Sequence, residues 1–225
     1  MDNHSDAFVF FGATGDLAYK KIFPALQAML KRGSLNVPVI GVSKAGWNLD
    51  QFKARALDSL EKHGGADPEA FRKLSSLLRY VDGDYGDPAT FEALGRELQS
   101  SRRPAHYLAI PPAMFEPVLE NLIHCRCMAN ARMIVEKPFG HDLASARHLN
   151  KVLLRNFEEK NVFRIDHYLG KRPVNNLVVF RFAKYLHGVL LESQLRRERA
   201  RLRWPRTSGC KAVGRSTTRL APSAT

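Results

Sequence analysis

The feature that most constrains this chain is an unbroken apolar run near its N-terminus that ends in a glycine turn. Residues 7–11 are followed by Gly12 and Gly15, and a new apolar periodicity begins at Leu17. This pattern predicts a strand buried on both faces, a tight turn and a helix. Glycines let a backbone approach a ligand closely, and the first turn of a helix favours a phosphate. The stretch therefore predicts a site for the pyrophosphate of a dinucleotide, although a structural turn without a cofactor is the alternative.

The rest of the first 183 residues alternates between buried strands and amphipathic helices. After the first strand, helical spacing runs from Leu17 to the stop at Arg32-Gly33, and further helices are expected to start at Asn48, Asp67 and Asp87 and to cover 112–121 and 143–154. Further strands are predicted at 37–42, 78–84, 105–112, 131–140 and 162–165. Such alternation predicts an α/β fold, a Rossmann-like doubly wound parallel sheet with right-handed crossovers.

The positive charge is concentrated at the C-terminal end. The net charge of the chain is +13, and residues 184–225 hold eight Arg and two Lys against two Glu. A segment with many charges of one sign and few large apolar groups cannot bury enough surface to offset its ordering entropy. We therefore expect two parts: a dinucleotide-binding domain over 1–183, and a basic tail over 184–225 that is disordered or forms a frayed helix. Nucleic-acid binding through the tail is a weak alternative because no motif accompanies the arginines.

Composition and cysteine count narrow the class further. The chain has no run of eighteen apolar residues, and it begins with a polar, acidic stretch, which predicts a cytoplasmic protein without a membrane span. Three cysteines cannot all pair, and Cys125-x-Cys127 lacks the second ligand pair of a zinc site. We expect reduced, structural cysteines and no metal.

Polar residues follow several of the predicted strands, where ligands bind in open α/β sheets. Ser43 and Lys44 end the second strand, and a hydroxyl with an ammonium suits the 2′-phosphate of NADP better than the free 2′-hydroxyl of NAD. The fifth strand ends in Glu136-Lys137-Pro138, which aims Lys137 at the crevice. In each case a solvated surface lysine is the alternative.

The sixth strand ends in the densest cluster of functional groups. Asp166, His167, Tyr168 and Lys171 place a carboxylate, an imidazole, a phenol and an ammonium within six residues. Together they predict an anion site with a group to be oriented.

Taken together, these segments resemble the N-terminal half of the glucose-6-phosphate dehydrogenase family over residues 7–183. The resemblance rests on the glycine turn from Gly12 to Ala18 with Lys21, on 107–112 (Tyr-Leu-Ala-Ile-Pro-Pro), on 136–140 (Glu-Lys-Pro-Phe-Gly), and above all on 164–171 (Arg-Ile-Asp-His-Tyr-Leu-Gly-Lys). It implies an enzyme of the pentose phosphate pathway that oxidises glucose 6-phosphate to 6-phosphogluconolactone with NADP as hydride acceptor. It also implies that intact relatives are homo-oligomers.

The resemblance assigns roles to individual positions. The cofactor would contact the turn residues Gly12, Ala13, Thr14, Gly15, Asp16 and Leu17, together with Lys21, Ser43, Lys44, Pro111, Lys137 and Pro138. Lys137 would also contact the substrate, whose phosphate His167, Tyr168 and Lys171 would hold. Asp166 would orient a histidine that takes the proton from the C1 hydroxyl.

Two departures from the family pattern stand out. The family usually has arginine where Lys44 stands, so a bidentate contact to the 2′-phosphate becomes a point charge, and strict preference for NADP is in doubt. The segment after Ala183 does not continue into the expected α+β domain, which would carry the base histidine. A non-catalytic NADP-binding module and another Rossmann sugar oxidoreductase with a Glu-Lys-Pro segment are therefore the alternatives.

Overall fold

The computed structural model describes residues 4–125, 127–128, 130–140, 142–166, 168–169, 171, 173–174 and 176. The chain divides into two compact units, Met1–His167 and Tyr168–Thr225. All strands and helices named below belong to the first unit. The predicted tail 184–225 and the predicted boundary at residue 183 lie outside the described residues.

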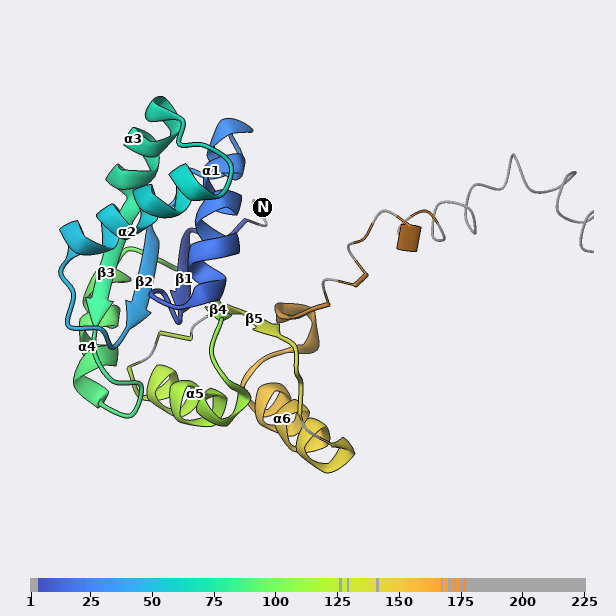
Figure 1. Cartoon of the computed structure of the whole chain (residues 1–225). Coiled ribbons are helices and arrows are strands. Elements are labelled where there is room, and N and C mark those ends of the chain that lie inside the picture. The colour runs from blue at the N-terminus through green and yellow to red at the C-terminus, as the bar shows by residue number, and fades with distance from the viewer. Residues whose placement is uncertain are drawn as a thin grey trace, which may run out of the picture. The chain divides into compact units, whose positions relative to one another are not determined.

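The core of the first unit is a six-stranded parallel sheet in the order β3-β2-β1-β4-β5-β6 (Figure 1). Its strands are β1 (Ala7–Phe11), β2 (Val39–Ser43), β3 (Leu78–Asp82), β4 (Pro104–Leu108), β5 (Arg132–Glu136) and β6 (Val162–Ile165). Each predicted strand is present, and the parallel, doubly wound sheet is confirmed. The strands that were expected to run past residues 108 and 136 end there, three residues before Pro111 and two residues before Pro138, which cannot donate to the ladder.

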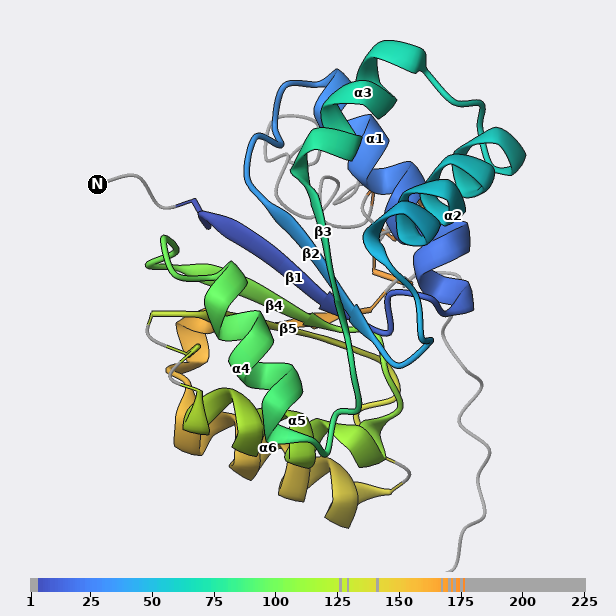
Figure 2. The same cartoon turned by 90° about the vertical axis from the view of Figure 1, so that its left-hand side faces the viewer.

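Helices lie on both faces of the sheet (Figure 2). One face carries α1 (Phe23–Lys31), α2 (Leu49–Lys62) and α3 (Pro68–Leu77), and the other carries α4 (Pro88–Glu97), α5 (Phe115–His124) and α6 (Leu143–Asn156). Right-handed crossovers explain the division, because the chain moves outward from β1 to β3 and then reverses direction at β4. Alternate side chains of β1 therefore enter two cores: Phe10 packs with the first three helices and Phe11 with the last three.

Side-chain caps fix the starts of the helices. The Asn48 and Gln51 side chains form a capping box at α2, and Asp67 and Asp87 cap α3 and α4, each just before a proline. Asp142 caps α6 by accepting the Ser145 N–H. The predicted helix starts at Asn48, Asp67 and Asp87 are confirmed.

Three local features differ from the sequence-based expectation. The first helix opens with a π-helical segment, η1 (Ala18–Ile22), and Pro112–Met114 is a separate 3-10 turn before α5. Cys125 and Cys127 are joined as a disulfide with Cα atoms 5.4 Å apart, so the prediction of reduced cysteines is wrong for this pair. The sequence signal was their two-residue spacing, which was considered only as half of a metal site.

Candidate functional site

The glycine turn joins the carboxyl ends of three neighbouring strands. Gly12 has φ +81°, and a Cβ built on it would lie 2.3 Å from the Ala109 carbonyl oxygen, so only glycine fits between β1 and β4. The Gly12 N–H donates to the Val42 carbonyl at 3.0 Å and to the Tyr85 hydroxyl at 2.7 Å. The turn is therefore a rigid element before any ligand arrives.

The helix that follows the turn presents its positive end at this edge. The first N–H groups of a helix have no partner within it, and here they belong to Asp16 and the residues around it. Lys20 lies 2.7 Å from the Asp16 carboxylate, and this hydrogen bond holds the Asp16 pKa below its usual range. Lys21 is exposed on the next position of the π-helical segment. The donors and the cation fit a pyrophosphate.

The end of β2 is less open than its sequence indicates. Ser43 is 3% exposed, and its hydroxyl lies 3.0 Å from the Tyr80 hydroxyl. Lys44 is exposed, but its ammonium lies 2.8 Å from an Asp84 carboxylate oxygen. The hydrogen bond to Asp84 raises the Lys44 pKa, and hydrogen bonds from the Gly86 N–H and from Lys44 lower that of Asp84. The acidic partner of Lys44 comes from the loop that follows β3, 40 positions away in the sequence.

A buried polar pair links β4 and β5 below their carboxyl ends. The Tyr107 hydroxyl donates to the Glu136 carboxylate, and the two residues are 8% exposed each. Burial, followed by the hydrogen bond to Glu136, raises the pKa of Tyr107. Both side chains lie on the sheet face that carries α1. Glu136 directly precedes Lys137 in the sequence.

Lys137 and Asp166 meet at the ends of β5 and β6. Their Nζ and Oδ2 atoms are 2.9 Å apart, and the Lys137 side chain is 54% exposed against 25% for Asp166. The peptide bond between Lys137 and Pro138 is cis. The structure thus brings together two residues predicted from separate motifs, 29 positions apart, at the edge where parallel sheets bind ligands.

The remaining predicted substrate residues lie beyond this pair in the chain. His167 lies outside the described residues. Tyr168 and Lys171 belong to the second unit, where the Lys171 N–H donates to the Tyr168 carbonyl at 3.2 Å and the Lys171 ammonium lies 5.2 Å from the centre of the Tyr168 ring. Tyr168 is 61% exposed. Their roles stay predictions.

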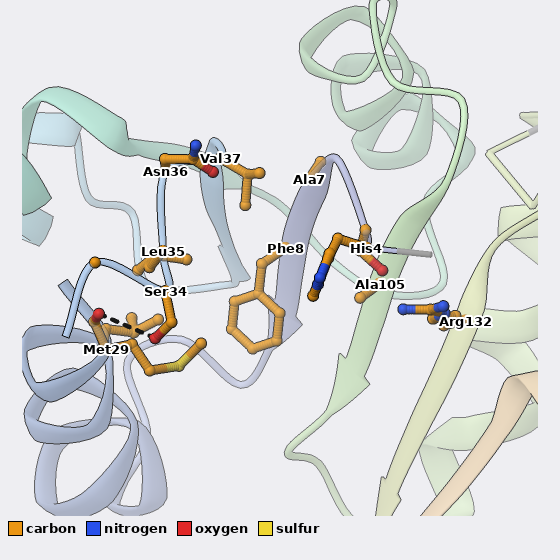
Figure 3. Close-up of a pocket in the computed structure, with 13 residues that line it drawn as sticks. His4, Ala7, Phe8, Met29, Ser34, Leu35, Asn36, Val37, Ala105 and Arg132 are labelled. Atoms are coloured by element: carbon orange, nitrogen blue, oxygen red, sulfur yellow. Dashed lines mark hydrogen bonds between the residues drawn. The ribbon is translucent and has the colours of Figure 1, made fainter. Parts of the chain in front are cut away.

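A pocket of about 440 Å³ lies at the opposite edge of the sheet (Figure 3). Phe8 and Ala105, the second residues of β1 and β4, and Arg132, the first residue of β5, line one side, and the loop after α1 closes the other side. Because it sits at the amino ends of the strands, it is remote from the glycine turn and from Lys137. It is not the cofactor site.

Sequence reasoning missed the residues that hold the predicted ones in place. Tyr85 fixes the Gly12 N–H, Asp84 holds Lys44, and the Asp82 carboxylate accepts the Ala45 and Gly46 N–H groups at 2.9 Å. These three come from the end of β3 and the loop after it. The signal was present as 82–86 (Asp-Gly-Asp-Tyr-Gly), which ends a strand adjacent to β2 in a doubly wound sheet.

In the part of the chain that the structure describes, no group of three His, Cys, Asp or Glu side chains is placed to hold a metal ion, and no helix is long and apolar enough to cross a membrane.

The strand order, the glycine turn and the polar residues at the carboxyl edge define a dinucleotide-binding domain of Rossmann type. Residues 9–176 match the family profile described as "Glucose-6-phosphate dehydrogenase, NAD binding domain". The chain belongs to the glucose-6-phosphate dehydrogenase family, a family of oxidoreductases, and the resemblance stated from its motifs is confirmed.

Individual relatives agree with the family match. The chain is 41% identical over 179 residues to glucose-6-phosphate 1-dehydrogenase 1 of Mycobacterium tuberculosis, covering 80% of this chain and 38% of the relative. A crystal structure of glucose-6-phosphate 1-dehydrogenase from Mycobacterium avium superimposes with a TM-score of 0.74 at 42% identity, covering 80% and 40% of the two chains. A glucose-6-phosphate dehydrogenase solved with its substrate gives 0.73 at 34% identity, covering 81% and 41%. The chain spans about two fifths of the length of these relatives.

Proposed function

We propose that this chain is the dinucleotide-binding half of a glucose-6-phosphate 1-dehydrogenase. The reaction oxidises D-glucose 6-phosphate to 6-phospho-D-glucono-1,5-lactone: hydride leaves C1 for NADP, and the C1 hydroxyl gives its proton to a base. One observation carries the proposal, the Lys137–Asp166 contact of 2.9 Å at the carboxyl edge of a domain that matches this family. Both residues belong to motifs that carry the family resemblance, and they meet at the edge of the sheet where ligands bind.

The roles of the chain's own residues follow from their places at that edge. The turn from Gly12 to Leu17 and Lys21 would bind the pyrophosphate of NADP, and Pro111 and Pro138 would line the nicotinamide end. Lys137 would contact both cofactor and sugar while Asp166 orients the base. When bound, NADP supplies the hydride acceptor. His167, Tyr168 and Lys171 would hold the sugar phosphate.

The 225-residue polypeptide would bind NADP but turn over slowly. A positioned base contributes about 10²–10⁴ in rate, and the family position of that histidine has no counterpart in this sequence. We expect reduction of NADP with glucose 6-phosphate to be at least about 10³ slower than in a relative of full length.

The test combines binding with turnover on the 225-residue polypeptide. Titration with NADP should show one site per chain, and Lys137→Ala should weaken it, whereas Lys160→Ala, which removes a surface lysine near β6, should not. NADPH absorbance with saturating glucose 6-phosphate should rise slowly or not at all. Binding without any turnover would favour the cofactor-binding module, and failure to bind either dinucleotide would overturn the proposal.

The proposal also covers the cellular location and the oligomeric state of the protein. The composition of the sequence favours a cytoplasmic location, and the family resemblance implies a homo-oligomer. Fractionation of cells that express the chain and light scattering of the purified chain test the two points.

A further inference from the structure

We propose that Asp84 is a specificity-determining residue: by holding Lys44 it makes this chain accept NAD nearly as well as NADP. The inference rests on the proposed dinucleotide binding and concerns the ribose end of the same site. It assigns the choice of cofactor to a residue of the loop after β3, away from the two residues that end β2.

The contact between the two loops is fixed at both carboxylate oxygens of Asp84. Its Oδ2 lies 2.8 Å from the Lys44 ammonium, and its Oδ1 accepts the N–H of Gly86 at 2.9 Å. The second bond belongs to the turn of the loop itself, so the carboxylate is already oriented toward Lys44. The ammonium therefore has a carboxylate partner within the protein.

A second carboxylate occupies the backbone donors of the same edge. Asp82 accepts the N–H groups of Ala45 and Gly46 at 2.9 Å each, and the Tyr80 hydroxyl at 2.9 Å. Burial pushes the Asp82 pKa up, but these hydrogen bonds outweigh it and leave the pKa below its usual range. Asp82 is thus ionised at neutral pH. The donors that a phosphate would use in the loop after β2 are engaged.

The charge balance of the edge follows from its sequence. Residues 43–47 and 82–86 contain one cation, Lys44, and two anions, Asp82 and Asp84. A 2′-phosphate must compete with Asp84 for the ammonium and is repelled by both carboxylates. A free 2′-hydroxyl meets neither obstacle, and it can donate a hydrogen bond to a carboxylate, which is how acidic residues select NAD at this edge. The arrangement thus weakens NADP without weakening NAD.

The decisive variant is Asp84→Asn. Asparagine keeps the Oδ1 acceptor for Gly86, so the turn stays, but it removes the negative charge and frees Lys44. Glu69→Gln is the matched control, because Glu69 makes the same kind of exposed 2.8 Å pair with Lys73 on α3. NADP and NAD are titrated separately at low salt and followed by calorimetry.

We expect Asp84→Asn to tighten NADP about fivefold, the upper range of an exposed ion pair, and to leave NAD unchanged or weaker. The gain should shrink at high salt. Glu69→Gln should leave the ratio of the two affinities as it is in the wild type. An unchanged or lower NADP preference in Asp84→Asn would overturn the inference.

A second variant distinguishes release of Lys44 from loss of repulsion. Lys44→Ala should cost more NADP affinity in the Asp84→Asn background than in the wild type, because only there is the ammonium available. Equal costs would show that the two residues are not coupled, and would also overturn the inference. If the wild type binds neither dinucleotide, the proposed function fails with it; if it binds NADP strongly over NAD, only the inference fails.

Discussion

The strands β2 and β6 differ in how completely the chain covers them. In β2 all five residues are buried, between α1–α3 on one face and the packing of α4 on the other. In β6 only Val162 is buried, and Phe163 is 44% exposed. β2 is thus covered on both faces, whereas β6 buries one residue and leaves the ring of Phe163 partly in water.

The crossovers explain this difference. Every connection after β3 passes over the face of α4, α5 and α6; on the other face α1 packs against Tyr107 of β4 but leaves Phe163 of β6 44% exposed. An apolar pocket of about 230 Å³ opens there between α1 and the sheet, with Tyr107, Ile134 and Ile165 on its floor. The comparison teaches that the glycine turn follows a strand covered on both faces, whereas Asp166 follows a strand that is open on one face.

The largest expected effect contrasts two phenylalanines. Phe11 is fully buried against Tyr85 and Phe91, so Phe11→Ala should cost about 3–5 kcal/mol of unfolding free energy. Phe163→Ala on the open face should cost less than about 1 kcal/mol, since much of its ring already faces water. Urea denaturation measures both. Similar costs for the two would mean that the open face is covered in solution.

The sequence could predict features that depend on neighbouring residues, but not contacts between distant loops. The strands were predictable because buried parallel strands are apolar without interruption, and the caps at Asn48, Asp67 and Asp87 have a clear local signature. Site residues such as Lys137 and Asp166 were predictable because each lies at the end of a predicted strand. The Lys44–Asp84 and Gly12–Tyr85 contacts were not, because they join loops 40 and 73 positions apart, and only the strand order makes β2 and β3 neighbours.

The next effect concerns the glycine turn that follows β1. Gly12→Ala places a methyl group against the Ala109 carbonyl oxygen at a positive φ, which should cost about 3 kcal/mol of stability and weaken dinucleotide binding. Gly33→Ala also meets a positive φ but open space, so it should cost about 1 kcal/mol and leave binding intact. Circular dichroism melts and dinucleotide titration distinguish them. Full binding by Gly12→Ala would remove the turn from the site.

The pH dependence of the unfolding free energy tests whether His106 on β4 is excluded from water. His106 is fully buried on β4, and burial lowers its pKa to about 4, although the Cys127 carbonyl accepts its hydrogen bond. The unfolded chain takes up this proton below about pH 6.5 and the folded chain only near pH 4, so stability falls as the pH drops through that window. Between pH 7 and 5 the loss should be about 2 kcal/mol.

The variant His106→Gln isolates this contribution. A glutamine amide can still donate to the Cys127 carbonyl but does not titrate, so most of the loss between pH 7 and 5 should disappear. His148→Gln, which removes a surface histidine from α6, should keep the loss because His106 remains. Urea midpoints at the two pH values decide, and an unchanged loss in His106→Gln would place its cause elsewhere.

The smallest expected effect on stability concerns the Lys137–Asp166 ion pair at the ends of β5 and β6. Lys137 and Asp166 are both partly exposed, so Asp166→Asn should change the unfolding free energy by less than about 1 kcal/mol, no more than Glu158→Gln in the neighbouring surface pair with Lys160. Urea denaturation of both variants tests this, and a loss of several kcal/mol in Asp166→Asn alone would make the pair part of the fold. If the loss is small, the fold does not require two charges held 2.9 Å apart at the ends of β5 and β6. Any change in dinucleotide or sugar binding by this variant then reports directly on the site.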